Sequence, residues 1–231
     1  MQIGALGDIH GAFDTVHDIM ERHPDVPLWV QVGDIASNDG EYFAPSRPVY
    51  WIKGNNEDFD VIAEAMLGRP PAPNLHYLPN GGVYDVGPWR VAALGGTFAP
   101  SWYHSPVVAL PPSRGRRVSS TSVKLGKSRD DKRRHFVREE VLACKALSGV
   151  DVLLTHEAPR PFYPQGKRID TGKTVINDVL AAMRPRLHLF GHHHEFTDSV
   201  RQNVRSIGLD LVTSSYLLID ADTFRCERLD T

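Results

Sequence analysis

The stretch QIGALGDIHGAFDTVHDIMERH, residues 2–23, joins two different hydrophobic patterns through a short polar turn. Its first five residues form an apolar run typical of a buried strand, whereas apolar residues recur at helical spacing from Phe13 onward. The turn between them, GDIHG, places a carboxylate and an imidazole directly after the strand. A strand followed by a helix begins a strand–helix–strand unit, which predicts parallel pairing with right-handed crossovers.

The same alternation continues through the N-terminal half of the chain. Apolar runs at 27–34 and 48–55 predict two more strands, and a helix is expected at about 58–67, where a glycine and three prolines follow. Segment 76–96 then alternates apolar and polar residues around the turn signals NGG and GP. This pattern predicts two antiparallel strands that lead into a second sheet.

The C-terminal half continues this order after a polar, basic insert at about 100–134. The elements expected there are a helix at 135–148, a strand at 150–154, a helix at 173–183, a strand at 186–190 and a hairpin at 215–229. No internal repeat or linker divides the sequence. We therefore expect one α/β domain over residues 1–231 that carries the insert.

The composition is that of an ordinary globular protein, with 41% apolar residues, 23% charged residues and a formal net charge of −2. Its two cysteines, Cys144 and Cys226, have no paired spacing and predict reduced thiols in an intracellular protein. No apolar run approaches the ~20 residues that span a bilayer, and a strand starting at Gln2 leaves no room for a signal peptide. The sequence predicts a cytoplasmic enzyme or binding protein.

Polar side chains follow five of the predicted strands at the point where each strand ends. They are Asp8 and His10, Asp34, Asn55, His156, and the pair His192 and His194. The carboxyl ends of strands in open α/β sheets are where ligands bind, so these side chains can converge on one crevice. In the run GHHH, alternate side chains of an extended segment point the same way, so His193 faces elsewhere.

The seven side chains offer two carboxylates, one amide oxygen and four imidazoles. Hard oxygen ligands mixed with imidazole nitrogens suit Mn, Fe, Zn or Co. Seven donors are too many for one tetrahedral zinc but suffice for two ions that share a carboxylate. Taken singly, each residue has an ordinary structural explanation, such as a turn aspartate or a packed histidine. The ordered set at five strand ends favours a metal site.

Five motifs carry a resemblance to a known family: GDIHG at 7–11, GD at 33–34, GNNE at 54–57, TH at 155–156 and GHHH at 191–194. In order and spacing they resemble the calcineurin-like metallophosphoesterase superfamily over nearly the whole chain. The resemblance implies an α/β fold, a four-layer αββα sandwich of two mixed sheets flanked by helices. It also implies a dinuclear centre at the strand ends.

The resemblance assigns the ligands to two ions. One ion is held by Asp8, His10, Asp34 and His194. The other is held by Asn55, His156 and His192, with Asp34 shared as the bridge. Mn²⁺ is the expected metal, with Fe, Zn, Co or Ni as alternatives. His193 is the variable position, so two of the three consecutive histidines are ligands.

The function implied is a metal-dependent phosphoesterase, with diesters expected more than monoesters. Two-metal chemistry implies in-line attack by a hydroxide that bridges the ions, and the protein contributes mainly positioning and electrostatics. The expected substrate is a phosphorylated small molecule, a nucleotide or a nucleic acid, with no membrane partner. The alternatives are a phosphomonoesterase or protein phosphatase of the same fold, and a non-catalytic scaffold protein.

Three features depart from patterns within this family. Asn56 stands where many relatives have a histidine; we expect it to contact phosphate, but an amide cannot supply a proton. His104 and His135, which bracket the insert, are candidate proton donors. Segment 33–41 lacks the Asp-Arg-Gly sequence of protein serine/threonine phosphatases. The layout of 76–160 resembles RNA lariat debranching enzymes, without their first-motif cysteine or their histidine at position 56.

The insert is strongly basic, with nine Lys/Arg against two Asp in RGRRVSSTSVKLGKSRDDKRR, residues 114–134. Beside a metal site such a segment can recruit a polyanionic substrate, whereas its serine content equally fits a solvated surface loop. No aromatic residue interleaves the basic ones, which weakens a base-stacking role.

If the insert recruits substrate, deleting residues 114–134 weakens hydrolysis of nucleotides or nucleic acids and reduces its salt dependence. A small chromogenic phosphoester has no flanking phosphates, so its hydrolysis is expected to stay unchanged. Steady-state rates at low and high salt with both substrates test the hypothesis. An equal loss on both substrates counts against it.

Overall fold

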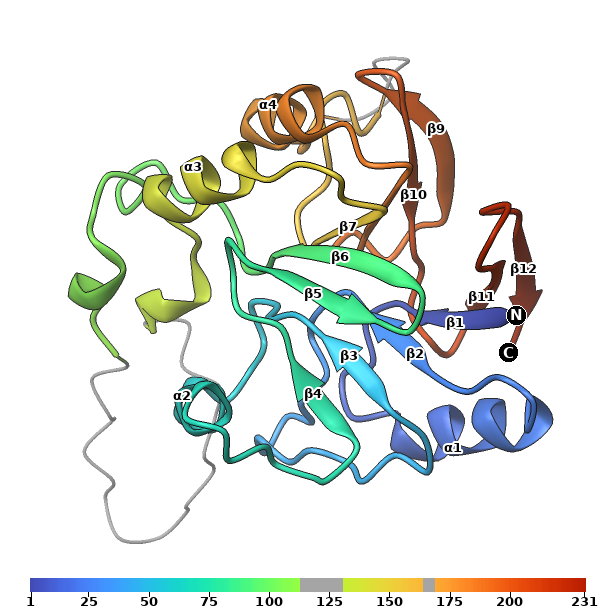
Figure 1. Cartoon of the computed structure of the whole chain (residues 1–231). Coiled ribbons are helices and arrows are strands. Elements are labelled where there is room, and N and C mark those ends of the chain that lie inside the picture. The colour runs from blue at the N-terminus through green and yellow to red at the C-terminus, as the bar shows by residue number, and fades with distance from the viewer. Residues whose placement is uncertain (113–130, 164–168) are drawn as a thin grey trace, which may run out of the picture.

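The computed structural model describes residues 1–112, 131–163 and 169–231. Two mixed sheets of six strands each pack face to face, with helices on the outer side of each sheet (Figure 1). The predicted four-layer α/β sandwich is confirmed. No helix in the described ranges is long and apolar enough to cross a membrane.

The first sheet has the order β12-β11-β1-β2-β3-β4. Its parallel strands are β1 (Gln2–Leu6), β2 (Trp29–Gln31), β3 (Val49–Trp51) and β4 (Leu75–Tyr77). The C-terminal hairpin of β11 (Ser215–Asp220) and β12 (Cys226–Asp230) joins β1 antiparallel. In this register Ala5 lies between Val30 and Leu217. The chain's last strands therefore support the strand that carries the first predicted metal ligands.

The second sheet has the order β5-β6-β7-β8-β10-β9. Its parallel strands are β6 (Trp89–Leu94), β7 (Val152–Thr155), β8 (Leu187–Phe190) and β10 (Val204–Gly208). The antiparallel edges are β5 (Val83–Val86) and β9 (Thr197–Arg201). The hairpin expected within 76–96 is confirmed as β5–β6, whereas β4 at the start of that segment pairs with β3 in the first sheet.

Helices cover the two outer faces. In Figure 1, α1 (Phe13–Arg22) lies below the first sheet and α2 (Phe59–Met66) lies to the left of β4, whereas α3 (Arg138–Ala146) and α4 (Thr174–Met183) lie above the second sheet. Short 3-10 turns occupy Val107–Ala109 and Lys132–Arg134. Asp58 caps the N-terminus of α2, and its carboxylate accepts hydrogen bonds from the backbone amides of Asp60 and Val61.

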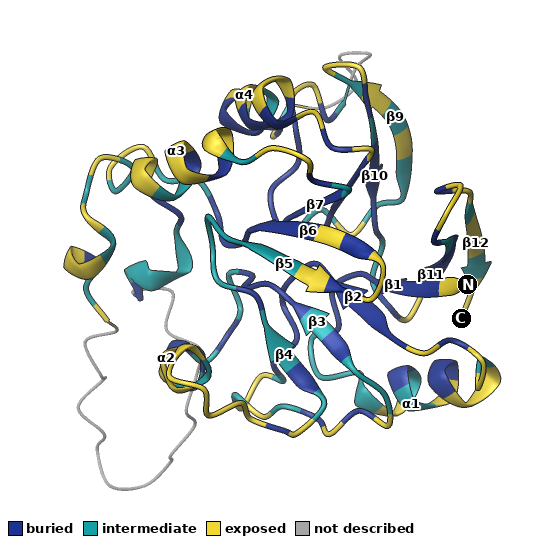
Figure 2. Cartoon of the chain, in the orientation of Figure 1, coloured by how far each residue is buried: buried dark blue, intermediate teal, exposed yellow. Residues whose placement is uncertain are grey.

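The hydrophobic core between the sheets holds their relative position. Leu154 and Leu189 from the second sheet pack there with Val30 from the first, and all three are fully buried. Figure 2 shows the central strands of both sheets as mostly buried, whereas the edge strands β5, β9 and β12 and the outer sides of the helices carry exposed residues. Separate apolar clusters bind α1 and α2 to one sheet and α3 and α4 to the other. The loops at the strand ends are thus mounted on two rigid, packed sheets.

The predicted insert lies largely outside the described residues, since 113–130 are not described, but its two ends adjoin. The Lys132 amide donates to the Pro111 carbonyl at 2.9 Å. Buried Lys53 then donates from Nζ to the carbonyls of Arg133 and His135, at 2.9 and 3.1 Å. Because residues 131–135 are packed against β3 in this way, the insert deletion is best limited to 114–130.

A row of buried polar side chains crosses the second sheet. His188 on β8 lies between Thr155 on β7 and Ser206 on β10, and all three are fully buried. The His188 ring nitrogens lie 2.8 Å from Thr155 Oγ1 and 3.1 Å from Ser206 Oγ. Burial lowers the pKa of His188 to about 3, so its imidazole is neutral in the folded protein near neutral pH.

This buried histidine predicts acid lability. The folded-state pKa lies below the unfolded value of about 6.5, so stability is fully present above pH 6.5 and falls as the pH drops toward about 3. Between pH 7 and pH 5 the contribution of His188 falls by about 2 kcal/mol. Urea unfolding in the presence of a chelator tests this. His188→Gln should show a smaller loss over that interval, and an unchanged loss would contradict the assignment.

Candidate metal centre

The five strand ends that carry the predicted ligands meet at one edge of the sandwich. Strands β1, β2 and β3 are parallel neighbours in the first sheet, and β7 and β8 are parallel neighbours in the second. Contacts of Asp34 and Asn55 with His156, and of Asp8 with His194, show that the carboxyl ends of the strands in the two sheets meet. The structure brings together Asp8, His10, Asp34, Asn55, His156, His192 and His194.

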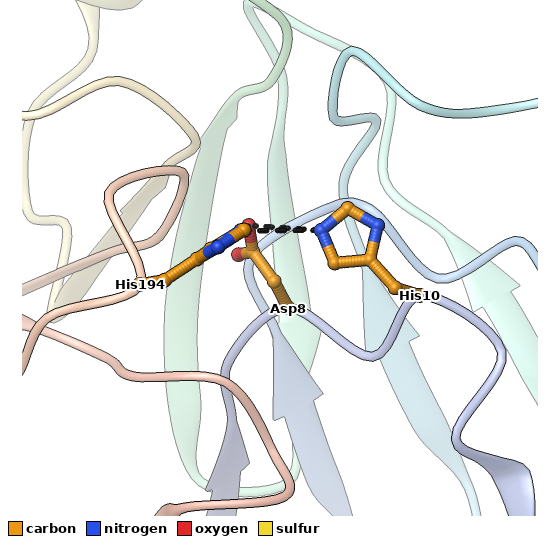
Figure 3. Close-up of side chains that lie close together, drawn as sticks. All are labelled: Asp8, His10 and His194. Carbon is orange, nitrogen blue, oxygen red and sulfur yellow. Dashed lines mark hydrogen bonds and ion pairs between the residues drawn. The ribbon is translucent and has the colours of Figure 1, made fainter.

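One group of donors comprises Asp8, His10 and His194, with a donor atom of each residue within 4.8 Å of the others. The His194 Nε2 lies 3.0 Å from Asp8 Oδ2 and 3.1 Å from His10 Nε2. His10 Nε2 lies 3.8 Å from the same carboxylate oxygen. Figure 3 shows the two imidazoles on either side of the Asp8 carboxylate. Two imidazole nitrogens and a carboxylate oxygen facing one point form a suitable cation site.

A second group lies beside it and centres on fully buried His156. Its Nδ1 donates to the Val32 carbonyl at 2.8 Å, which directs Nε2 toward the crevice. That Nε2 lies 3.1 Å from Asn55 Oδ1. The ring of His192 packs against it, with centroids 4.8 Å apart. The second group therefore provides two imidazoles and an amide oxygen.

Asp34 lies between the two groups. Its Oδ2 is 3.6 Å from His10 Nε2, and its Oδ1 is 3.7 Å from His156 Nε2. Each oxygen of one carboxylate thus faces a different imidazole group, an arrangement in which a carboxylate can bridge two ions. Asp8 and Asp34 also form a compact, fully buried group with His156.

The middle histidine of the run lies in an aromatic cluster. The His193 ring stacks on Phe162 with centroids 4.2 Å apart, and its Nδ1 lies 3.4 Å from Thr171 Oγ1. Phe162 also contacts Tyr163, whose hydroxyl donates to Glu195 at 3.3 Å. His193 thus packs beside the candidate site instead of joining either donor group.

Strained backbone is concentrated in the site loops. Of the eight non-glycine residues with positive φ in the described chain, four are predicted ligands. They are His10 at 48°, Asp34 at 61°, His192 at 73° and His194 at 51°. Each such conformation costs about 1 kcal/mol or more for a residue with a Cβ. The surrounding fold holds these loops in place against that cost.

Two glycines allow the loops to approach closely. A Cβ on Gly54 would lie 2.0 Å from Asp34 Oδ1, and a Cβ on Gly191 would lie 2.3 Å from Asp8 Oδ1. Both distances are far below van der Waals contact, so any side chain at these positions would displace a carboxylate. The glycines before Asn55 and His192 are therefore part of the site.

The electrostatics of the site hold Asp34 ionised and keep the His192 imidazole neutral. Burial raises the pKa of Asp34, but the His156 charge, the Asn56 amide and the His10 charge outweigh it and hold the pKa below its usual value. Burial lowers the pKa of His192 to about 3, which keeps this imidazole neutral. The hydrogen bond to Asp8 raises the pKa of His194, and the Asp34 and Asp8 charges outweigh burial and raise the pKa of His156. Both shifts favour the protonated imidazoles, so a metal ion must displace those protons when it binds. Ionised carboxylates and neutral imidazoles are the states that ligate metals.

Two buried carboxylates close together fit a bound cation. Among the described residues, neither Asp8 nor Asp34 forms an ion pair with lysine or arginine, and both have histidine partners. Unpaired buried anions are costly, and divalent cations remove that cost. The donor set therefore fits divalent metal ions.

Sequence reasoning missed the residues that join the site loops. Fully buried Gln31 donates to the carbonyls of Gly7 and Gly33 and accepts from the Gly33 amide at 2.7 Å. Glu57 accepts from Gly54 and from Ile35, at 3.3 and 3.0 Å. Burial raises the pKa of Glu57 to about 7. Glu57 ends the GNNE motif, which could have singled it out, but nothing local marks Gln31.

Asn56 contacts Asp34 in this structure. Its backbone amide donates to Asp34 Oδ1 at 2.6 Å, and its side-chain Nδ2 donates to Asp34 Oδ2 at 2.9 Å. Asn56 thus orients the carboxylate between the two groups. Of the two candidate proton donors, His104 is exposed, and its ring contacts the Tyr103 ring edge to face. The other candidate, His135, forms a hydrogen bond with Thr97 Oγ1, and burial lowers its pKa to about 4. Near pH 7 its imidazole is therefore neutral, not the protonated form that a general acid needs.

The chain's similarities to known proteins agree with this geometry. The family model described as calcineurin-like phosphoesterase matches residues 1–196. A lariat debranching enzyme of Schizosaccharomyces pombe is 24% identical, over 88% of this chain and 50% of that enzyme. An uncharacterized Haemophilus influenzae protein is 27% identical, over 82% of this chain and 81% of its own length. The chain thus spans about half the length of the S. pombe enzyme.

A solved structure shares the fold. Protein TT1561 of Thermus thermophilus superposes with a TM-score of 0.65 at 15% identity, covering 99% of this chain and 98% of that one. At this identity the likeness concerns the arrangement of strands and helices alone.

The glycine contacts predict a specific effect on metal binding. Gly54→Ala should displace Asp34 and weaken Mn²⁺ binding by about tenfold or more, because the new methyl occupies the carboxylate's position. Isothermal titration calorimetry measures the affinity. The control is Gly68→Ala, where an added Cβ meets nothing within 4 Å; its φ of 80° makes this substitution cost stability, but manganese affinity should stay unchanged. Equal manganese affinity in Gly54→Ala and the wild type would show that the loops do not need this approach.

Proposed function

The chain belongs to the calcineurin-like phosphoesterase family, and from that membership and the site geometry we propose that it is a dinuclear metal-dependent phosphodiesterase. The observation that carries the proposal is Asp34, whose two oxygens face His10 on one side and His156 on the other. A single-ion site would not need a carboxylate shared between two groups of imidazoles.

The proposal gives each residue a role. Asp8, His10, Asp34 and His194 would hold one ion, and Asn55, His156 and His192 would hold the other with Asp34 shared. When bound, two divalent ions lower the pKa of a water molecule and neutralise charge on phosphoryl oxygens. Manganese is the proposed metal, since carboxylate, amide and imidazole donors suit it.

The protein's own hydrogen bonds orient the proposed ligands. Asn56 holds both oxygens of Asp34 through its backbone and side-chain amides, and its side chain can also donate to a phosphoryl oxygen. Hydrogen bonding to the Val32 carbonyl fixes the tautomer of His156, leaving Nε2 as the ligating atom. The His192 amide donates to Asp8 at 3.1 Å, which orients that carboxylate.

A nucleotide or nucleic-acid diester is the proposed substrate class. The similarity to a lariat debranching enzyme supports it, as does the basic composition of residues 114–134. The missing Asp-Arg-Gly sequence at 33–41 argues against a protein phosphatase. The compartment proposed is the cytoplasm, which the free cysteines Cys144 and Cys226 support.

The direct test is hydrolysis of bis-(p-nitrophenyl) phosphate with manganese, compared with p-nitrophenyl phosphate. Asp34→Asn should lower the diester rate by about a hundredfold or more, because an amide cannot bridge two cations as a carboxylate does. Asp39→Asn, at an exposed position of the following loop, serves as the matched control and should stay near the wild-type rate. A scaffold protein would cleave neither ester, and a monoesterase would favour the second.

Asn56 generates a prediction on leaving groups. Because asparagine cannot protonate a departing alkoxide, the rate should fall steeply as the leaving group becomes more basic. Asn56→His supplies an ionisable donor and should flatten that dependence, even if its rate with p-nitrophenyl esters is lower. A series of aryl diesters measures the slope. The same slope in both proteins would show that residue 56 does not influence protonation of the leaving group.

A further inference from the structure

The buried row Thr155–His188–Ser206 ends at the metal centre. Thr155 Oγ1 lies 2.7 Å from the Glu157 carbonyl oxygen, so the row connects to the turn that contains His156. Paired register places His188 opposite Leu153 on β7 and opposite Ser206 on β10. Three neighbouring strands thus contribute one polar side chain each.

The hydrogen atoms of Thr155 and His188 have one consistent order. The Glu157 carbonyl can only accept, so the Thr155 hydroxyl donates to it. Thr155 Oγ1 must then accept from His188, which places the imidazole hydrogen on Nε2. Since His188 is neutral, its Nδ1 is an acceptor for the Ser206 hydroxyl at 3.1 Å, and that hydroxyl also lies 3.4 Å from the Val204 carbonyl. From His188 onward, donation runs in one direction, to the Glu157 carbonyl.

The row lies in apolar surroundings, so each of its hydrogen bonds matters for stability. Leu153 and Val204, on the same strands, belong to the cluster that packs α3 and α4 against the second sheet. Polar groups buried there are costly if any partner is lost. The Thr155 hydroxyl needs an acceptor outside the row, and the one it uses is a backbone carbonyl one residue from His156.

We propose that His188 is a positioning residue for the metal centre: through Thr155 it fixes the Thr155–Glu157 turn and thereby the place of the His156 imidazole. This inference rests on the proposed function, since it gives His188 a role at that same site. His188 contacts neither substrate nor ion. Its effect reaches the centre through the turn, because His156 lies between the residues that the Thr155 hydroxyl links.

The test compares variants that break the row with variants that keep it. His188→Leu and Thr155→Val remove the hydrogen bonds, whereas His188→Gln retains a side-chain N–H and Thr155→Ser retains the hydroxyl. Leu153→Ala is the control, since Leu153 is fully buried opposite His188 but outside the row. Each variant is titrated with Mn²⁺ by calorimetry, and its unfolding by urea is measured separately.

We expect His188→Leu and Thr155→Val to bind Mn²⁺ about tenfold more weakly than the wild type, the effect found when groups that orient ligands are lost. His188→Gln and Thr155→Ser should recover most of that loss, and Leu153→Ala should lose stability but not affinity. The inference is overturned if both disrupting variants bind as the wild type does. It is also overturned if affinity follows stability through all five variants.

A second measurement uses the metal-free protein. The hydrogen on His156 Nδ1, which donates to Val32, should give a protected imidazole N–H signal in NMR spectra. His188→Leu and Thr155→Val should weaken or broaden that signal, and Leu153→Ala should leave it unchanged. An unaltered signal in the disrupting variants would contradict the inference. Because this readout needs no metal, failure of the proposed function and failure of this inference give different results.

Discussion

The structure depends on placing the Asp34 carboxylate, fully buried, between two groups of imidazoles. Asp8 lies close by, so two anions share a site with no lysine or arginine partner among the described residues. Buried charges of this kind are stable only with compensating charge and hydrogen bonds. Donation from Asn56 and the imidazoles supplies part of it, and divalent cations would supply the rest. In the same region, four of the seven donor residues have a left-handed backbone conformation, which the surrounding fold must stabilise.

The double-sheet architecture serves this constraint. Asp8, His10, Asp34 and Asn55 follow strands of the first sheet, whereas His156, His192 and His194 follow strands of the second. Both proposed ion sites therefore combine donors from the two sheets, and the core between the sheets sets the distance between those donors. The close approach at Gly54 and Gly191 completes the arrangement. A shift of one sheet against the other would separate Asp34 from His156, so packing far from the site supports its chemistry.

Much of this was predictable from the sequence because the relevant signals are local. Apolar runs, the turn at Gly87 and the polar residues after each strand indicated the strands, the β5–β6 hairpin and the clustered donors. The hairpin of β9 and β10 was missed, since the half-exposed β9 carries no apolar run. Gln31 and His188 were missed for a different reason. Each has partners far away in the sequence. Gln31 bonds Gly7 after β1, and His188 bonds Thr155 and Ser206 on the neighbouring strands, so only the assembled sheets reveal their roles.

The account is tested most directly by diffraction from crystals grown with manganese, recorded for its anomalous signal. Two peaks about 3.5–4 Å apart, one on each side of the Asp34 carboxylate, are the expected result. One peak should lie among Asp8, His10 and His194, and the other among Asn55, His156 and His192. A single ion, or ions bound away from Asp34, would contradict the claim that this carboxylate bridges a dinuclear centre.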